Sequence, residues 1–229
     1  MKHEATVLRP DGKAERRLLT WDLCVAIDYA GCDQKAVRAH VDERVKPGFP
    51  RPHSIPALYW IDPNRVSSRE HLWVTGESTS GEAEVFLARD EGGDQYVTLA
   101  GGHTDRALEK FSVSKAKQIC DRILAPVFWK VSDLREHWNR VEISSEIPQE
   151  DGYRTYQKGT LGDLLPPERL EELAREDAPA PGKVALFSGA PATLEGVVFA
   201  GAFRLTLSDP VLNRAIRFGY RISVLPDRH

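Results

Sequence analysis

Short runs of alternating hydrophobic and polar residues fill most of this chain, and that pattern predicts β-strands. Turn-forming residues separate the runs, for example Pro10-Asp11-Gly12 and Asp90-Glu91-Gly92-Gly93-Asp94. The expected strands cover residues 4–9, 16–27, 57–61, 71–75, 83–88, 95–100, 184–188, 196–207 and 216–225. The chain is therefore expected to be built mainly of strands.

A few helices are expected between these strands. Asp33 can cap a helix that runs to about Val45, and Ser112 can cap one over residues 113–124 with an apolar stripe along one side. Shorter helices are expected at 132–138 and, after two prolines, at 168–175. Strands with irregularly placed helices favour an α+β fold over an alternating parallel sheet.

A run rich in proline, Lys46–Pro52, interrupts the chain after the first expected helix. We therefore predict two units. Residues 1–50 form a small N-terminal β/α segment, and residues 51–229 form the larger domain.

The composition excludes several classes of function. Hydrophobic residues make up 41% of the 229 residues, the net charge is −3, and basic residues are scattered, which argues against a nucleic-acid partner. No apolar run approaches the roughly 18 residues of a membrane span, and the N-terminus lacks a signal-peptide pattern. The three cysteines do not form a CxxC pattern, so we expect reduced thiols and a cytoplasmic location.

Glu82 and Glu84 give the strongest local chemical signal. In an extended strand alternate side chains share a face, so both carboxylates point the same way, together with Phe86. Two adjacent carboxylates repel each other, and a hard cation with oxygen ligands removes that penalty. The alternative is an edge strand whose acids simply face water.

A second signal is Gly101-Gly102-His103-Thr104-Asp105-Arg106, which follows an expected strand. Paired glycines allow close approach of the backbone to a ligand, and a histidine at a strand end is a common general base. The alternative is a glycine turn with local capping bonds. A third signal is Ser188-Gly189-Ala190-Pro191, whose backbone N–H groups and hydroxyl suit a carboxylate or an enolate oxygen. On this pattern alone an ordinary turn is the favoured explanation.

In this order, over roughly residues 55–225, the three motifs resemble the fumarylacetoacetate hydrolase superfamily, and more narrowly an uncharacterised bacterial branch of it. Glu82-Ala83-Glu84 matches the superfamily's E-x-E strand, and Ser188-Gly189-Ala190-Pro191 matches its T-G-T-P-like loop. Ser114-Lys115-Ala116-Lys117 stands where a lysine-bearing stretch belongs. One position departs from the pattern, because Gly102 stands where the third carboxylate is expected.

The resemblance implies a mixed β-roll or sandwich with short peripheral helices, a homodimer, and a small carbonyl or carboxylate substrate. It implies Mg²⁺ or Mn²⁺, or else Ca²⁺, held by Glu82 and Glu84. Asp105 or His103 is the candidate third ligand in place of Gly102. The implied activity is a hydrolase or decarboxylase that acts on a diketo or keto-enol acid through a metal-stabilised enolate.

The remaining roles follow the same resemblance. Lys117 is expected to neutralise the substrate oxyanion, with Lys115 as the fallback, and a lysine on the helix surface is the alternative. His103 is expected to move the proton, and Glu77 is expected as an outer partner. The expected substrate-binding residues are Arg106, Ser188 and Gly189, although Arg106 is also suited to bracing the acidic residues.

Two other functions stay open at this point. The first is a metal-free isomerase or cyclase on the same fold that uses His103, which the glycine at position 102 favours. The second is a non-catalytic protein that binds a small molecule. Substitution of Glu82 and Glu84 separates these functions, because only a metalloenzyme should lose turnover by orders of magnitude.

Overall fold

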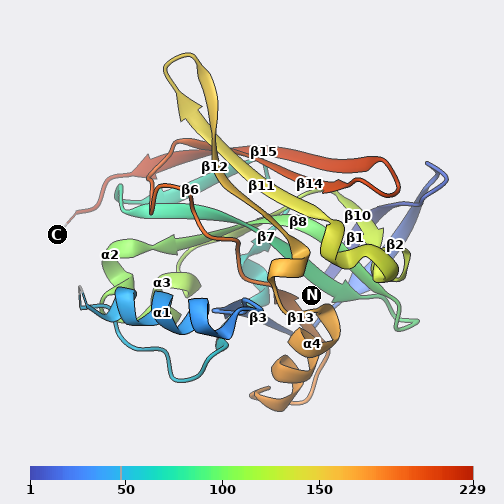
Figure 1. Cartoon of the computed structure of the whole chain (residues 1–229), viewed down its shortest axis with the longest axis horizontal. Helices are drawn as coiled ribbons and strands as arrows, with labels where there is room; N and C mark the ends of the chain where they lie inside the picture. The colour runs from blue at the N-terminus through green and yellow to red at the C-terminus, as the bar shows by residue number, and fades with distance from the viewer. Residues whose placement is uncertain (47, 229) are drawn as a thin grey trace.

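The computed structural model describes residues 1–46 and 48–228, which form two β-sheets with helices at their edges (Figure 1). The first sheet has ten strands, of which eight follow the order β2-β1-β10-β8-β7-β13-β3-β4, while β9 joins β8 and β5 joins β9. Its strands are β1 (Lys2–Leu8), β2 (Ala14–Thr20), β3 (Leu23–Asp28), β4 (Ala57–Ile61), β5 (Val66–Ser67), β7 (Thr79–Arg89), β8 (Gln95–Asp105), β9 (Arg122–Leu124), β10 (Val127–Lys130) and β13 (Val184–Phe187).

The second sheet has five strands in the order β12-β11-β14-β15-β6. They are β6 (His71–Thr75), β11 (Glu142–Gln149), β12 (Gly152–Thr160), β14 (Ala202–Asp209) and β15 (Arg214–Leu225). The α-helices are α1 (Gln34–Val45), α2 (Arg106–Glu109), α3 (Val113–Gln118) and α4 (Pro167–Glu176), and the 3-10 helices are η1 (Pro63–Arg65), η2 (Val131–Asp133), η3 (Arg135–Arg140) and η4 (Leu161–Asp163).

The antiparallel pair β7 and β8 is the centre of the fold. The register places Glu82 opposite Gly102 and Glu84 opposite Ala100, so these four residues share one face of the pair. The neighbouring pair, Gly81 and His103, faces the opposite way. Because alternate side chains point to opposite faces of the sheet, Glu82 and Glu84 lie on one face and His103 lies on the other.

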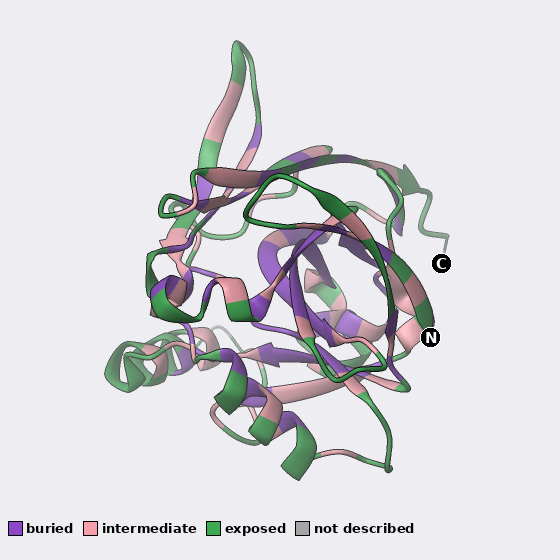
Figure 2. Cartoon of the chain, turned by 90° about the vertical axis from the view of Figure 1, so that its right-hand side faces the viewer, coloured by how far each residue is buried: buried purple, intermediate pink, exposed green. Residues whose placement is uncertain are grey.

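Each face of this pair covers its own hydrophobic core. Val85 and Leu99 belong to a cluster that also contains Phe203 and Tyr220 of the five-stranded sheet, so this cluster fills the space between the two sheets. Phe86 belongs to a second cluster within the first sheet. In Figure 2 the buried segments gather where the strands of the two sheets meet, and the exposed segments form the outer loops and helix faces.

The fold class predicted from the sequence, α+β and mostly β with a few short helices, is confirmed. Several boundaries were wrong. The expected helix at 113–124 ends at Gln118, and Arg122–Leu124 forms β9, because these residues pair with β8 and β5. The run 16–27 is two strands, separated at Trp21 and Asp22, and the expected helix at 132–138 is replaced by two 3-10 helices.

The division into residues 1–50 and 51–229 stays a prediction. Strands from the first segment enter the large sheet, where β1 pairs with β10 and β3 pairs with β13 and β4. In the part of the chain that the structure describes, no helix has the length and apolar character needed to cross a membrane.

Candidate active site

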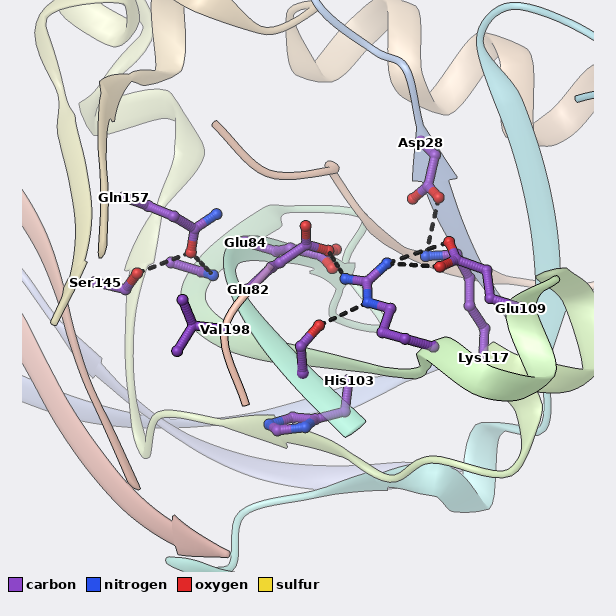
Figure 3. Close-up of polar contacts among 12 residues, drawn as sticks. Asp28, Glu82, Glu84, His103, Glu109, Lys117, Ser145, Gln157 and Val198 are labelled. Carbon is purple, nitrogen blue, oxygen red and sulfur yellow. Dashed lines mark hydrogen bonds and ion pairs between the residues drawn. The ribbon is translucent and has the colours of Figure 1, made fainter. Parts of the chain in front are cut away.

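The candidate site lies on the face of β7 and β8 that carries Glu82 and Glu84, where α2 and α3 pack against the sheet (Figure 3). Gly102 decides the local geometry. A Cβ at this position would lie 2.0 Å from Glu84 Oε1 and 2.5 Å from Arg122 Nη1, so any side chain would collide with both groups. Any side chain at position 102 would displace the ends of Glu84 and Arg122, so this glycine leaves the space that their ion pair occupies.

Glu84 forms a buried ion pair with Arg122. The distance from Arg122 Nη1 to Glu84 Oε1 is 3.1 Å, and the two side chains are 0% and 3% exposed. The guanidinium also lies over the ring of Phe187, with 4.8 Å from Cζ to the ring centroid. Burial raises the pKa of Glu84, and the positive charge of Arg122 opposes that rise without cancelling it.

Glu82 belongs to a chain of alternating charges. Arg106 Nη2 lies 3.2 Å from Glu82 Oε2, Arg106 Nη1 lies 3.1 Å from Glu109 Oε2, and Arg44 lies 2.7 Å from the same Glu109 oxygen. Arg106 Nε also donates a hydrogen bond to Ser80 Oγ at 2.6 Å. Burial opposes ionisation of Glu82, but the charges of Arg106 and Lys117 outweigh it, so the pKa of Glu82 lies below its ordinary value.

Lys117 is buried, which excludes the simpler interpretation of a lysine on the helix surface. Its side chain is 2% exposed, and its Nζ lies 2.9 Å from Asp28 Oδ2 and 5.6 Å from the ring centroid of Tyr59 (Figure 3). The side chains of Asp28 and Glu82 are each 26% exposed. The ammonium therefore sits just behind two carboxylates that reach solvent.

His103 lies on the opposite face of the sheet from this cluster. Its Nε2 is 2.8 Å from the hydroxyl of Tyr220, and its ring packs edge-on against Phe203 and Tyr220. Complete burial, with the charges of Arg122 and Arg106, lowers the pKa of His103 to about 3. The suggestion that His103 supplies a third ligand beside Glu82 and Glu84 is therefore wrong, because the sheet lies between them.

Asp105 does not point toward the glutamates either. It caps α2, and its Oδ1 accepts a hydrogen bond from the Leu108 N–H at 2.9 Å. The register also places Asp105 on the same face of β8 as His103, and its expected place among metal ligands stays a prediction. Glu77 is exposed in the turn before β7.

The Ser188-Gly189 turn is committed to the fold. The Ser188 hydroxyl accepts a hydrogen bond from Val85 N–H at 3.2 Å and donates one to the Gly189 carbonyl at 2.8 Å. Gly189 has a φ of +79°, and a Cβ there would lie 2.6 Å from the Ile27 carbonyl oxygen. The substrate-binding role expected for both residues stays a prediction, and their described bonds anchor β13 to β7.

Gln157 connects the second sheet to the strand that carries the glutamates. Its Oε1 accepts hydrogen bonds from Ala83 N–H and Ser145 Oγ, each at 2.8 Å (Figure 3). Its Nε2 donates a hydrogen bond to the Pro191 carbonyl at 2.8 Å. Because all of these groups are buried, the bonds fix β7 and the loop after Ser188 in one arrangement.

The donor set does not fit the divalent metal that the resemblance implies. Within residues 1–46 and 48–228, no group of three or more His, Cys, Asp or Glu side chains is placed to hold a metal ion. Glu82 is paired with Arg106 and Glu84 with Arg122, and the position of the third carboxylate is Gly102.

Sequence reasoning missed several residues of this cluster. They are Asp28, Arg44, Glu109 and Arg122. Asp28 carried a weak signal, since it ends an apolar strand with a charge. Arg122 carried none, because it stands in a run that reads as the last turn of a helix.

The chain matches a protein family and is similar to several solved structures. Residues 27–220 match the family described as protein of unknown function, DUF2848. The chain belongs to this family. No curated protein matches the DUF2848 chain.

Solved structures share the fold of this DUF2848 protein. Cg1458 in complex with an inhibitor is similar with a TM-score of 0.66 and 13% identity, over 98% of this chain and 90% of that one. 2-Keto-3-deoxy-D-arabinonate dehydratase complexed with magnesium and 2,5-dioxopentanoate is similar with a TM-score of 0.63 and 15% identity, over 93% and 77%. At these identities the likeness shows a common fold.

Proposed function

We propose that this protein is an enzyme that acts on a small keto acid, or on a related compound with an enolisable carbonyl group, and that its reaction passes through an enolate. The observation that carries the proposal is the buried ammonium of Lys117 behind the partly exposed carboxylates of Asp28 and Glu82. The fold shared with a dehydratase of a 2-keto-3-deoxy acid supports the substrate class.

In this proposal Glu82 takes the proton next to the carbonyl group. Its pKa lies below the ordinary value, so the side chain is a carboxylate at neutral pH, and Arg106 holds it in position. As the C–H bond breaks, its electron pair moves toward the carbonyl oxygen and forms the enolate. The sequence suggested His103 as the residue that moves the proton. We assign that role to Glu82 instead, because His103 lies on the opposite face of the sheet.

Lys117 stabilises the enolate oxygen. An ammonium has three donors, and Asp28 takes one of them at 2.9 Å, so donors remain for a substrate oxygen. In a site with little water, such a charge stabilises a developing oxyanion far more strongly than it would in solution. Dehydration and isomerisation begin with this removal of a proton. In decarboxylation and in hydrolysis of a C–C bond, the electron pair of the breaking C–C bond forms the enolate, and Lys117 would stabilise its oxygen in the same way. These four reactions form the range to test.

Turnover of a substrate panel tests the proposal. The panel contains 2-keto acids, 3-deoxy-2-keto acids and acylpyruvates, and mass spectrometry detects the products. We expect the protein to convert at least one class. Lys117→Met should lower kcat by about 10²–10³, the usual effect of removing an oxyanion donor. Lys115→Met is the matched control, because Lys115 is exposed on the same helix and should leave kcat unchanged.

Failure of every panel member to be converted contradicts the proposal. Equal loss in the two lysine variants, with both folded by circular dichroism, also contradicts it, because position 117 would then have no special role. The homodimer implied by the resemblance stays a prediction, and light scattering after size-exclusion chromatography measures it directly.

A further inference from the structure

The space opposite Glu82 is filled from another part of the chain. Gly102 pairs with Glu82 across β7 and β8, and it stands where the sequence pattern places a third carboxylate. The volume that a side chain at 102 would enter holds Glu84 Oε1 and Arg122 Nη1, at 2.0 and 2.5 Å from an added Cβ. Arg122 comes from β9, which pairs with β8 at Ala100 and Gly101.

Arg122 supplies positive charge beside Glu84, where a bound cation would otherwise be needed. Its Nη1 lies 3.1 Å from Glu84 Oε1, and Gly102 adds no further carboxylate that would have to be neutralised. Because a guanidinium stays protonated at any working pH, its compensation of Glu84 does not depend on the supply of metal.

Three polar atoms of the ion pair between Glu84 and Arg122 are buried without a hydrogen bond anywhere in the described chain, which lowers the stability that the pair contributes. This favours a functional reason for the pair. Arg122 Nε and Nη2 and Glu84 Oε2 are buried without a hydrogen bond from the described residues. Apolar residues of similar volume often stabilise a core as well as a buried ion pair does. Stability alone therefore gives little reason to keep this pair beside Glu82 and Lys117.

We propose that Arg122 replaces the divalent metal ion, so that its guanidinium is the resident cation at Glu84 and the site works without a bound metal. The ring of Phe187 holds the guanidinium from one side, at 4.8 Å from Cζ. The identity of the cation at Glu84 does not depend on which substrate the protein converts. It is tested by metal binding, whereas the proposed function is tested by turnover.

Titration with Mn²⁺, followed by the electron paramagnetic resonance signal of the free ion, tests the inference on the full chain. We expect the wild-type protein to leave the Mn²⁺ signal unchanged at millimolar metal. The double variant Gly102→Asp, Arg122→Ala has three carboxylates on one face and no guanidinium at Glu84, while Arg106 still pairs with Glu82. Removal of the Arg122 side chain leaves room for Glu84 to move away from the aspartate introduced at position 102. This variant should bind one Mn²⁺ per chain, about 100-fold or more tighter than wild type.

Addition of Glu84→Gln to the double variant should abolish the gained binding, which locates the ion. Two results overturn the inference. One is a wild-type protein that binds one Mn²⁺ and loses it in Glu84→Gln. The other is a double variant that is folded by circular dichroism and binds no Mn²⁺. If the double variant does not fold, Arg122→Ala alone replaces it, and unchanged binding in that folded variant overturns the inference as well.

Discussion

Substitution of Gly102 by alanine should destabilise the protein far more than the size of a methyl group suggests. The added Cβ would lie 2.0 Å from Glu84 Oε1, and real contacts of this kind stay above 3.0 Å, so the carboxylate must retreat by about 1 Å. Arg122 Nη1, at 2.5 Å, must retreat by about 0.5 Å in the same crowded space. Both movements act on an ion pair that is only 3.1 Å long and fully buried.

Two contributions set the magnitude. Overpacking of a dense core costs roughly 1–3 kcal/mol. Separation of a buried ion pair costs about 3–5 kcal/mol when the charge is left uncompensated. Because the pair is strained here and not deleted, we expect a loss of about 3 kcal/mol in the free energy of unfolding.

Urea unfolding followed by tryptophan fluorescence measures the loss, because Trp21 and Trp129 are buried in the native state. The matched control is Gly219→Ala in β15, another strand glycine, whose added Cβ would lie 3.6 Å from the Phe203 carbonyl oxygen, an ordinary contact. It should change stability by less than about 1 kcal/mol. Equal stabilities of the two variants would refute the crowding of Glu84 and Arg122 against Gly102.

Three further predictions concern the charges and the buried histidine. Glu84→Gln and Arg122→Met should each lower the free energy of unfolding by about 3–5 kcal/mol. In a double-mutant cycle measured by urea unfolding, the double variant should lose clearly less than the sum of the two single losses, and additive losses would contradict a direct ion pair. Tyr220→Phe removes the hydrogen-bond partner of His103 Nε2 and should lower the free energy of unfolding by about 1–3 kcal/mol in the same assay. A Tyr220→Phe variant as stable as the wild type would contradict a stabilising role of that bond. Because the pKa of Glu82 is lowered, its ionisation stabilises the fold above the ordinary glutamate pKa of 4.5, and that contribution disappears as the pH falls through the lowered value. If Glu82 is the base, the decline of kcat/KM at acid pH should have its midpoint below pH 4.5, and a midpoint near pH 6 would assign the base to another group.

The sequence pattern was sufficient for the strands and for the direction of the two glutamates. Alternation through β7 places Glu82 and Glu84 on one face without any tertiary information, and the register in the structure agrees. Boundaries failed where one pattern fits two structures. The apolar residues near 120–124 suit a helix stripe equally well, and only pairing with β8 and β5 makes Arg122–Leu124 a strand.

The partners of the glutamates could not be predicted, because they come from distant parts of the chain. Asp28 meets Lys117 across 89 positions, and Arg122 meets Glu84 across 38. The face of His103 follows from its position next to Gly102, but only once the register of β8 against β7 is known. The residue types alone do not indicate that the guanidinium of Arg122 occupies the space beside Gly102.

Exchange of substrate protons for deuterium tests directly whether Glu82 removes a proton next to the carbonyl group without a bound metal ion. The keto acid converted most readily is incubated with the protein in D₂O, and proton NMR follows the signal next to the carbonyl group, once with a chelator and once with added Mg²⁺. Exchange should occur at the same rate in both samples, because Glu82 removes the proton and Lys117 holds the enolate. Exchange that occurs only with Mg²⁺, or isomerisation of the substrate without any exchange, would contradict this role of Glu82.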